Sequence, residues 1–147
     1  MNLLEIAKKT IKKPNNETRV IFENGKTEDI VKVILLADLK SKECTKEFAK
    51  YLKGRNILET CKNIFYFLKK NIKYIKDKEG IQDVKSPCKT FSDGFADCKS
   101  LSIFAASILK NLKIPYKYRL ASYSNSKIPT HIYVVAIDEK KKILYLI

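Results

Sequence analysis

The chain has 147 residues, and 45% of them are hydrophobic, which is enough for one domain with a buried core. The 30 lysines and arginines outnumber the 16 acidic residues and give a net charge of +14, which allows contact with anionic partners. Just three of the basic residues are arginines, the side chain that most often reads base edges, so nucleic-acid binding is possible but not expected to be sequence-specific. No apolar run approaches the roughly 20 residues of a membrane-spanning helix, and no membrane span is expected.

The first half of the chain is predicted to be mainly helical. Residues 2–13 form a short basic helix that ends before a proline, and residues 18–23 form a short strand. Two further helices are expected at about 27–39 and 45–53. A third follows over 56–72, where an Asn and a Glu three residues later form a capping box. The apolar face of this third helix repeats at the helical period and consists of Ile57, Cys61, Ile64, Phe65, Leu68 and Ile72.

Residues 76–96 show neither helical nor alternating periodicity and are expected to form a long loop. A loop of this length is uncommon inside a compact domain and often has a function. The pattern becomes helical again from Lys99. Asp97 is the natural N-cap of that helix, and Pro115 marks the chain's exit from it.

Three strands are predicted after this helix, with a tight two-residue turn between the last two. We therefore expect an α+β fold in a single domain over 1–147. Its helical N-terminal part would span 1–75, and its core would span 76–147, with one central helix on a three-stranded antiparallel sheet. The strands are expected at 116–123, 131–138 and 142–147.

The four cysteines lie at positions 44, 61, 88 and 98, with no Cys-x-x-Cys pair of the kind found in structural zinc sites. The N-terminus lacks the basic region and apolar stretch of a secretory signal peptide. We therefore expect a cytoplasmic protein of a bacterial host, with association with a virion as an alternative. Disulfides are rare in that reducing compartment, so none is expected, and neither a metal nor a cofactor is expected.

Cys98 and His131 are the residues with the clearest potential for chemistry. Cys98 would be the first residue of its helix, where the helix dipole favours a thiolate. Its backbone N–H is one of the unpaired donors of a helix N-terminus and could bind an oxyanion. His131, the single histidine of the chain, begins the second predicted strand. The two residues therefore suit the roles of a thiol nucleophile and its base.

The residues around this pair resemble a known family. The run from Gly94 to Ser100, the Ile114-Pro115 exit and the run from Thr130 to Val134 look like the transglutaminase-like, papain-related thiol enzymes. The resemblance covers residues 80–147. It implies a papain- or transglutaminase-like core, a catalytic Cys98, a base His131 and an acid that orients the histidine. It also implies an oxyanion-hole donor upstream of the cysteine, for which Gln82 is the candidate.

The acid that the resemblance implies is missing from its usual place. In the family it lies on the next strand, about 16 or 17 residues after the histidine, which here is Ile147 or one residue beyond it. Asp138 is a poor substitute, because an odd separation from His131 places it on the other sheet face and about 23 Å away. The chain is therefore truncated, works with a Cys–His dyad, or has lost activity.

Three functions remain open. The first is a transglutaminase-like thiol enzyme, active or impaired, that hydrolyses an amide or transfers an acyl group through Cys98 on a protein or peptide substrate. The second is a non-catalytic basic binding or structural module of phage or mobile-element origin with the same fold. The third is a metal site formed by Cys88, Cys98 and His131.

Overall fold

The computed structural model describes residues 2–15, 27–78, 81–122 and 131–146. The strand expected at 18–23 lies outside the described residues. In chain order, the elements are α1 (Leu3–Thr10), α2 (Thr27–Thr45), the 3-10 helix η1 (Ala49–Leu52), α3 (Ile57–Asn71), β1 (Lys73–Tyr74), α4 (Pro87–Asp93), β2 (Phe95–Ala96), α5 (Cys98–Asn111), β3 (Tyr116–Ala121), β4 (His131–Asp138) and β5 (Ile143–Leu146).

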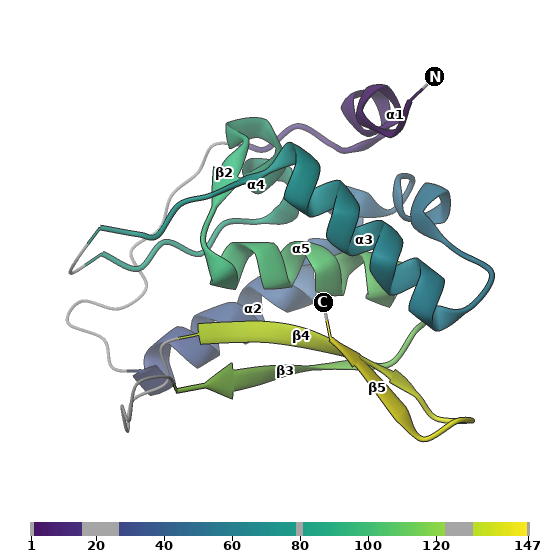
Figure 1. Ribbon diagram of the computed structural model, residues 1–147. Coiled ribbons are helices and arrows are strands. Elements are labelled where there is room, and N and C mark those ends of the chain that lie inside the picture. The colour runs from purple at the N-terminus through teal and green to yellow at the C-terminus, as the bar shows by residue number, and fades with distance from the viewer. Residues whose placement is uncertain (1, 16–26, 79–80, 123–130, 147) are drawn as a thin grey trace.

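Helix α5 lies at the centre of the fold, with the sheet on one side and α2, α3 and α4 on the others (Figure 1). Its side chains Ile103, Phe104, Ile108 and Leu109 are all fully buried. A helix that is apolar on more than one face needs neighbours on several sides. The predicted helix is therefore confirmed, and it forms the core of the molecule.

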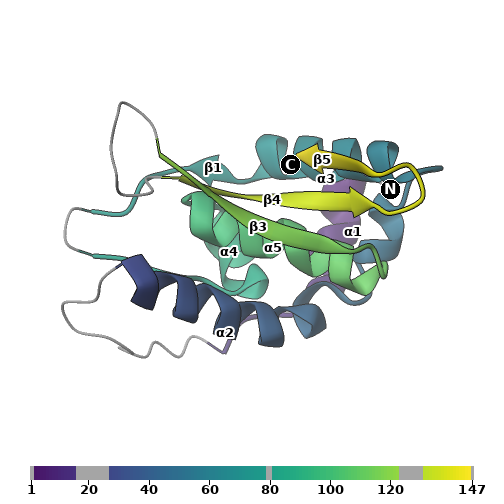
Figure 2. The same ribbon diagram turned by 90° about the horizontal axis from the view of Figure 1, so that it is seen from below.

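Strands β3, β4 and β5 form an antiparallel sheet in that order. Alternate residues of β4, namely Ile132, Val134 and Ala136, are buried on the face that packs against α5. Viewed from below, β3 lies on the side of α2 and β5 on the side of α3 (Figure 2). Strands β1 and β2 pair in a separate, parallel two-stranded ladder.

The connection between β4 and β5 is longer than the predicted two-residue turn. Asp138 pairs with Ile143, so residues 139–142 form the turn. The carboxylate of Asp138 accepts a hydrogen bond from the backbone N–H of Lys141 at 3.2 Å, and Lys142 has a positive φ of 53°. An aspartate that bonds to its own turn stabilises such a connection, which moves the register from the one expected.

The helical first half is confirmed, although two boundaries differ from those predicted. Helix α2 continues to Thr45 instead of ending near Leu39, because the intervening residues include neither glycine nor proline. The helix expected at 45–53 is reduced to the short η1. Asn56 caps α3 as predicted, accepting a hydrogen bond from the N–H of Glu59 at 2.8 Å. Among the described residues, no helix is long and apolar enough to cross a membrane.

The segment 76–96 is not one long loop, as expected, because it contains α4 and β2. Ser86 caps α4 by accepting a hydrogen bond from the N–H of Lys89 at 3.1 Å, and Pro87 occupies its first turn. Gly94 ends the helix in the left-handed conformation, with φ 77°. These end signals are present in the sequence, but seven residues are too few to show a helical period.

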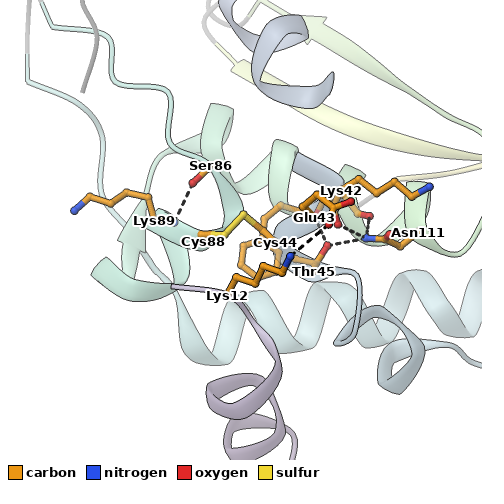
Figure 3. Close-up of a disulfide and its surroundings, with 11 residues drawn as sticks. Lys12, Lys42, Glu43, Cys44, Thr45, Ser86, Cys88, Lys89 and Asn111 are labelled. Atoms are coloured by element: carbon orange, nitrogen blue, oxygen red, sulfur yellow. Dashed lines mark hydrogen bonds and ion pairs between the residues drawn. A yellow bond between two sulfur atoms is a disulfide. The ribbon is translucent and has the colours of Figure 1, made fainter. Parts of the chain in front are cut away.

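The expectation that the chain forms no disulfide is wrong. Cys44 at the end of α2 and Cys88 in α4 form a disulfide, with their Cα atoms 5.3 Å apart (Figure 3). Their separation of 44 residues gives no hint of this approach, which depends on the packing of α2 against α4. The disulfide also removes Cys88 as a thiolate ligand, so the alternative metal site is not retained. Cys61 and Cys98 are free thiols.

Candidate active site

Cys98 is the first residue of α5, as predicted, and it is a partly exposed free thiol. Asp97 caps the helix, its carboxylate accepting hydrogen bonds from the N–H groups of Lys99 at 3.1 Å and Ser100 at 3.4 Å. The carbonyl of Asp97 accepts a third from the N–H of Leu101 at 3.1 Å. Within the described part of the chain, the first-turn N–H left unpaired is that of Cys98. It is therefore available to a negative charge that develops beside the sulfur.

A buried ion cluster fixes the beginning of α5. The ammonium of Lys99 forms an ion pair with Asp97 and a second with Asp77, 3.1 Å away on the segment after β1. Burial opposes the charge of Lys99, but the two carboxylates outweigh this effect and raise its pKa. Burial raises the pKa of Asp97, and Lys99 offsets this in part. The cluster therefore connects Asp97, the cap residue next to Cys98, to the segment between β1 and α4.

Tyr74 lies beside the thiol, although no pattern in the sequence singles it out. In the parallel ladder Tyr74 pairs with Ala96, two residues before Cys98, and the N–H of Ile75 donates to the carbonyl of Ala96 at 2.9 Å. The phenol of Tyr74 therefore lies close enough to Cys98 for the two side chains to interact electrostatically. Partial burial, the charge of Cys98 and that of Asp97 raise the pKa of Tyr74, so its hydroxyl keeps its proton at neutral pH.

His131 begins β4, as predicted, and β4 and α5 begin at the same end of the core (Figure 1). Ser102, one helical turn after Cys98, donates a hydrogen bond to the carbonyl of Ile132 at 3.2 Å. Cys98 also packs against the apolar cluster that contains Ile132 and Ile103. Cys98 and His131 therefore lie at the ends of α5 and β4 that are in contact with one another.

The imidazole of His131 leaves β4 on the face opposite Ile132. It stacks on the ring of Tyr133, with 6.0 Å between the ring centroids.

The structure supplies no carboxylate from β5 beside His131 among the described residues. Strand β5 pairs with β4 only as far as Val135. Asp138 lies at the opposite end of β4, where it bonds to its own turn. Of the carboxylates near Cys98, both Asp97 and Asp77 are paired with Lys99.

Gln82 is exposed on the segment between β1 and α4. This segment is held against α5 nearby, because the N–H of Lys85 donates to the hydroxyl of Ser100 at 3.0 Å. The buried ammonium of Lys85 lies 2.9 Å from the carboxylate of Asp93 and 3.7 Å from the ring centre of Phe95. The role predicted for Gln82 therefore stays a prediction. No group of three or more metal-ligating side chains is found in the described ranges.

Comparison with known proteins gives two matches. A family model described as a transglutaminase-like domain matches residues 43–146. The fold is similar to the crystal structure of a "putative protease" from Parabacteroides distasonis, with a TM-score of 0.64 and 13% sequence identity. The similarity covers 87% of this chain and 30% of that protein, so this chain spans less than a third of its length. No curated protein matches the chain.

Proposed function

Because the chain belongs to the transglutaminase-like domain family, we propose that it is a thiol enzyme that acts on an amide bond of a protein or peptide through an acyl-enzyme on Cys98. One observation carries the proposal. The free thiol of Cys98 lies at a helix N-terminus beside the unpaired backbone N–H of its own residue, and the phenol of Tyr74 lies close to it. Two donors beside a nucleophile are what an acyl-transfer site requires.

The reaction begins with transfer of the thiol proton of Cys98 to the imidazole of His131. The thiolate attacks the amide carbonyl, forming a C–S bond, and the carbonyl oxygen becomes an oxyanion. The backbone N–H of Cys98 and the hydroxyl of Tyr74 donate to this oxyanion. His131 returns the proton to the nitrogen as the C–N bond breaks. Water or a second amine then attacks the acyl carbon and releases the thiol, giving hydrolysis or transfer.

The described part of β5 places no carboxylate beside His131, and the proposed mechanism uses a Cys–His dyad. Loss of the acid from a serine triad lowers turnover by about 10⁴-fold. A cysteine is intrinsically a stronger nucleophile than a serine, and Cys98 has the helix N-terminus beside it. The dyad is therefore expected to form the acyl-enzyme more readily than it completes rapid turnover.

The test is to trap the acyl-enzyme with p-nitrophenyl acetate. We expect a burst of p-nitrophenolate with one acetyl group on Cys98, located by peptide mass spectrometry. The Cys98→Ala variant should lose the burst, and Cys61→Ala should keep it. If Cys98 is acetylated no faster than free cysteine, the proposal fails. The alternative of a non-catalytic basic module then stands, and it predicts salt-sensitive binding to an anionic partner that Cys98→Ala leaves unchanged.

A further inference from the structure

An apolar groove of about 420 Å³ lies between α2 and the edge strand β3. Viewed from below, the two elements run beside one another along one side of the molecule (Figure 2). The groove is partly open, and Leu35 on α2 and Leu120 on β3 are 51% and 47% exposed. The apolar side chains that line it are Val31, Ile34, Leu35, Leu120 and Ile132.

We infer that this groove binds an apolar side chain of the substrate, aliphatic or aromatic, next to the bond on which Cys98 acts. The inference rests on the proposed function and adds the class of substrate to it. The volume of the groove suits a substrate side chain, because sites for small ligands commonly enclose about 300–1,000 Å³. A volume at the low end of that range accommodates one or two side chains rather than a folded partner.

The groove shares two lining residues with the cluster beside Cys98. Ile34 and Ile132 line the groove, and both belong to the buried cluster against which Cys98 packs. In the sheet, Leu120 pairs with Ile132, and the next pair joins Ala121 with His131. Because neighbouring pairs face opposite sides of a sheet, the groove approaches the candidate site from the side of Cys98 and not from that of the imidazole.

Asp38 and the two tyrosines that line the other end of the groove are paired with one another. The carboxylate of Asp38 accepts hydrogen bonds from the hydroxyls of Tyr116 at 2.9 Å and Tyr118 at 2.6 Å. It also forms an ion pair with Lys110 at 2.9 Å. Lys117 lines the groove as well, with an exposed side chain. Because an unpaired charge is costly away from water, the end of the groove formed by apolar residues favours a neutral side chain.

The test compares two dipeptide chloromethyl ketones, N-acetyl-Leu-Gly and N-acetyl-Gly-Gly, which alkylate a thiolate with loss of chloride. Leu35→Lys and Leu120→Lys fill the groove with charge at exposed positions, where the fold tolerates them. Leu39→Lys is the matched control, because Leu39 is 73% exposed on the same helix and does not line the groove. The rate of each variant with iodoacetamide, which carries no side chain, normalises its peptide rates.

We expect the leucyl reagent to modify the wild-type protein at Cys98 about tenfold faster than the glycyl reagent, a common gain from one apolar side chain in a pocket. This preference should disappear in Leu35→Lys and Leu120→Lys and persist in Leu39→Lys. Equal rates for the two reagents at a reactive Cys98 overturn the groove assignment and leave the proposed function intact. A Cys98 that reacts with neither reagent faster than a free thiol overturns both.

A second copy of the chain is the rival occupant of the groove, and analytical ultracentrifugation distinguishes it. If Leu35→Lys and Leu120→Lys convert a dimer into a monomer while the leucyl preference stays unchanged, the groove is a dimer interface and the inference is overturned. A protein whose sedimentation is the same in all three variants supports the assignment to substrate.

Discussion

The phenol of Tyr74 lies beside the thiol of Cys98, and a two-residue parallel ladder places it there. Lys73 pairs with Phe95 and Tyr74 with Ala96, so the phenol on β1 lies next to the residues that precede α5. In the proposed mechanism the hydroxyl of Tyr74 donates to the oxyanion that forms on the carbon bonded to the sulfur. Tyr74 would then have the role for which the resemblance to thiol enzymes suggests Gln82.

Replacing Tyr74 with phenylalanine should slow acyl transfer more than alkylation. Acetylation by p-nitrophenyl acetate builds an oxyanion, whereas alkylation by iodoacetamide does not. One oxyanion donor is commonly worth about 10²–10³ in rate. Because Tyr74 is 48% exposed and the N–H of Cys98 remains, we expect a loss of about 10- to 100-fold in acetylation. Tyr66→Phe, at an exposed position on α3, is the control and should keep the wild-type rate. An equal loss in both reactions would limit Tyr74 to holding the thiolate.

Cys98 and His131 could be placed from the sequence because their signals are local. An aspartate cap before an apolar helical pattern indicates the beginning of α5, and a run of apolar, mostly β-branched residues after His131 indicates β4. Tyr74 gave no such signal, since two residues are too short for any period and the parallel partner is remote in sequence. Its role depends on a contact that forms only when the chain is folded.

The same distinction explains the other differences. Ser86 and Gly94 mark the two ends of α4, yet the helix between them is too short to show a helical period in the sequence. The β4–β5 register depends on how Asp138 bonds to its turn, which moves the pairing away from that of a two-residue hairpin. The Cys44–Cys88 disulfide requires α2 to lie against α4, and this packing cannot be read from cysteine spacing.

Asp93 should make the stability of the fold depend on acid pH. Burial disfavours its charge, but the ammonium groups of Lys85 and Lys89 outweigh this and lower its pKa. A carboxyl whose pKa is lower in the folded state stabilises the fold above its unfolded pKa of about 3.9. That stability is lost as the pH falls through the folded pKa.

We therefore expect Asp93→Asn to lower the free energy of unfolding at pH 7 by about 2 kcal/mol, because it leaves the buried Lys85 without its carboxylate. Urea denaturation at pH 7 and pH 3 measures this, and the difference between variant and wild type should shrink at the lower pH. Glu139→Gln, in the exposed β4–β5 turn, should show neither effect. A difference that stays constant with pH would show that the charge of Asp93 is not responsible.

Reduction of the Cys44–Cys88 disulfide should destabilise the protein. The bridge joins positions 44 residues apart, and a cross-link of that span commonly contributes about 2–4 kcal/mol. Dithiothreitol should therefore lower the urea midpoint of the wild type and of Cys61→Ala, but not that of the Cys44→Ala/Cys88→Ala double variant. Titration of four thiols in the unreduced, denatured wild-type protein would show instead that the disulfide does not form in solution.

Alkylation of the native protein by iodoacetamide at pH 6 tests the pairing of Cys98 with His131 most directly. Cys61 is an internal control, because burial raises its pKa to about 11. We expect Cys98 to be labelled about tenfold or more faster than glutathione, because an imidazole that accepts the thiol proton activates the sulfur as a nucleophile. Cys61 should remain unlabelled, and His131→Ala should slow Cys98 to the rate of glutathione. Labelling of Cys98 at the rate of glutathione in the wild type, or at an unchanged fast rate in His131→Ala, would contradict the account.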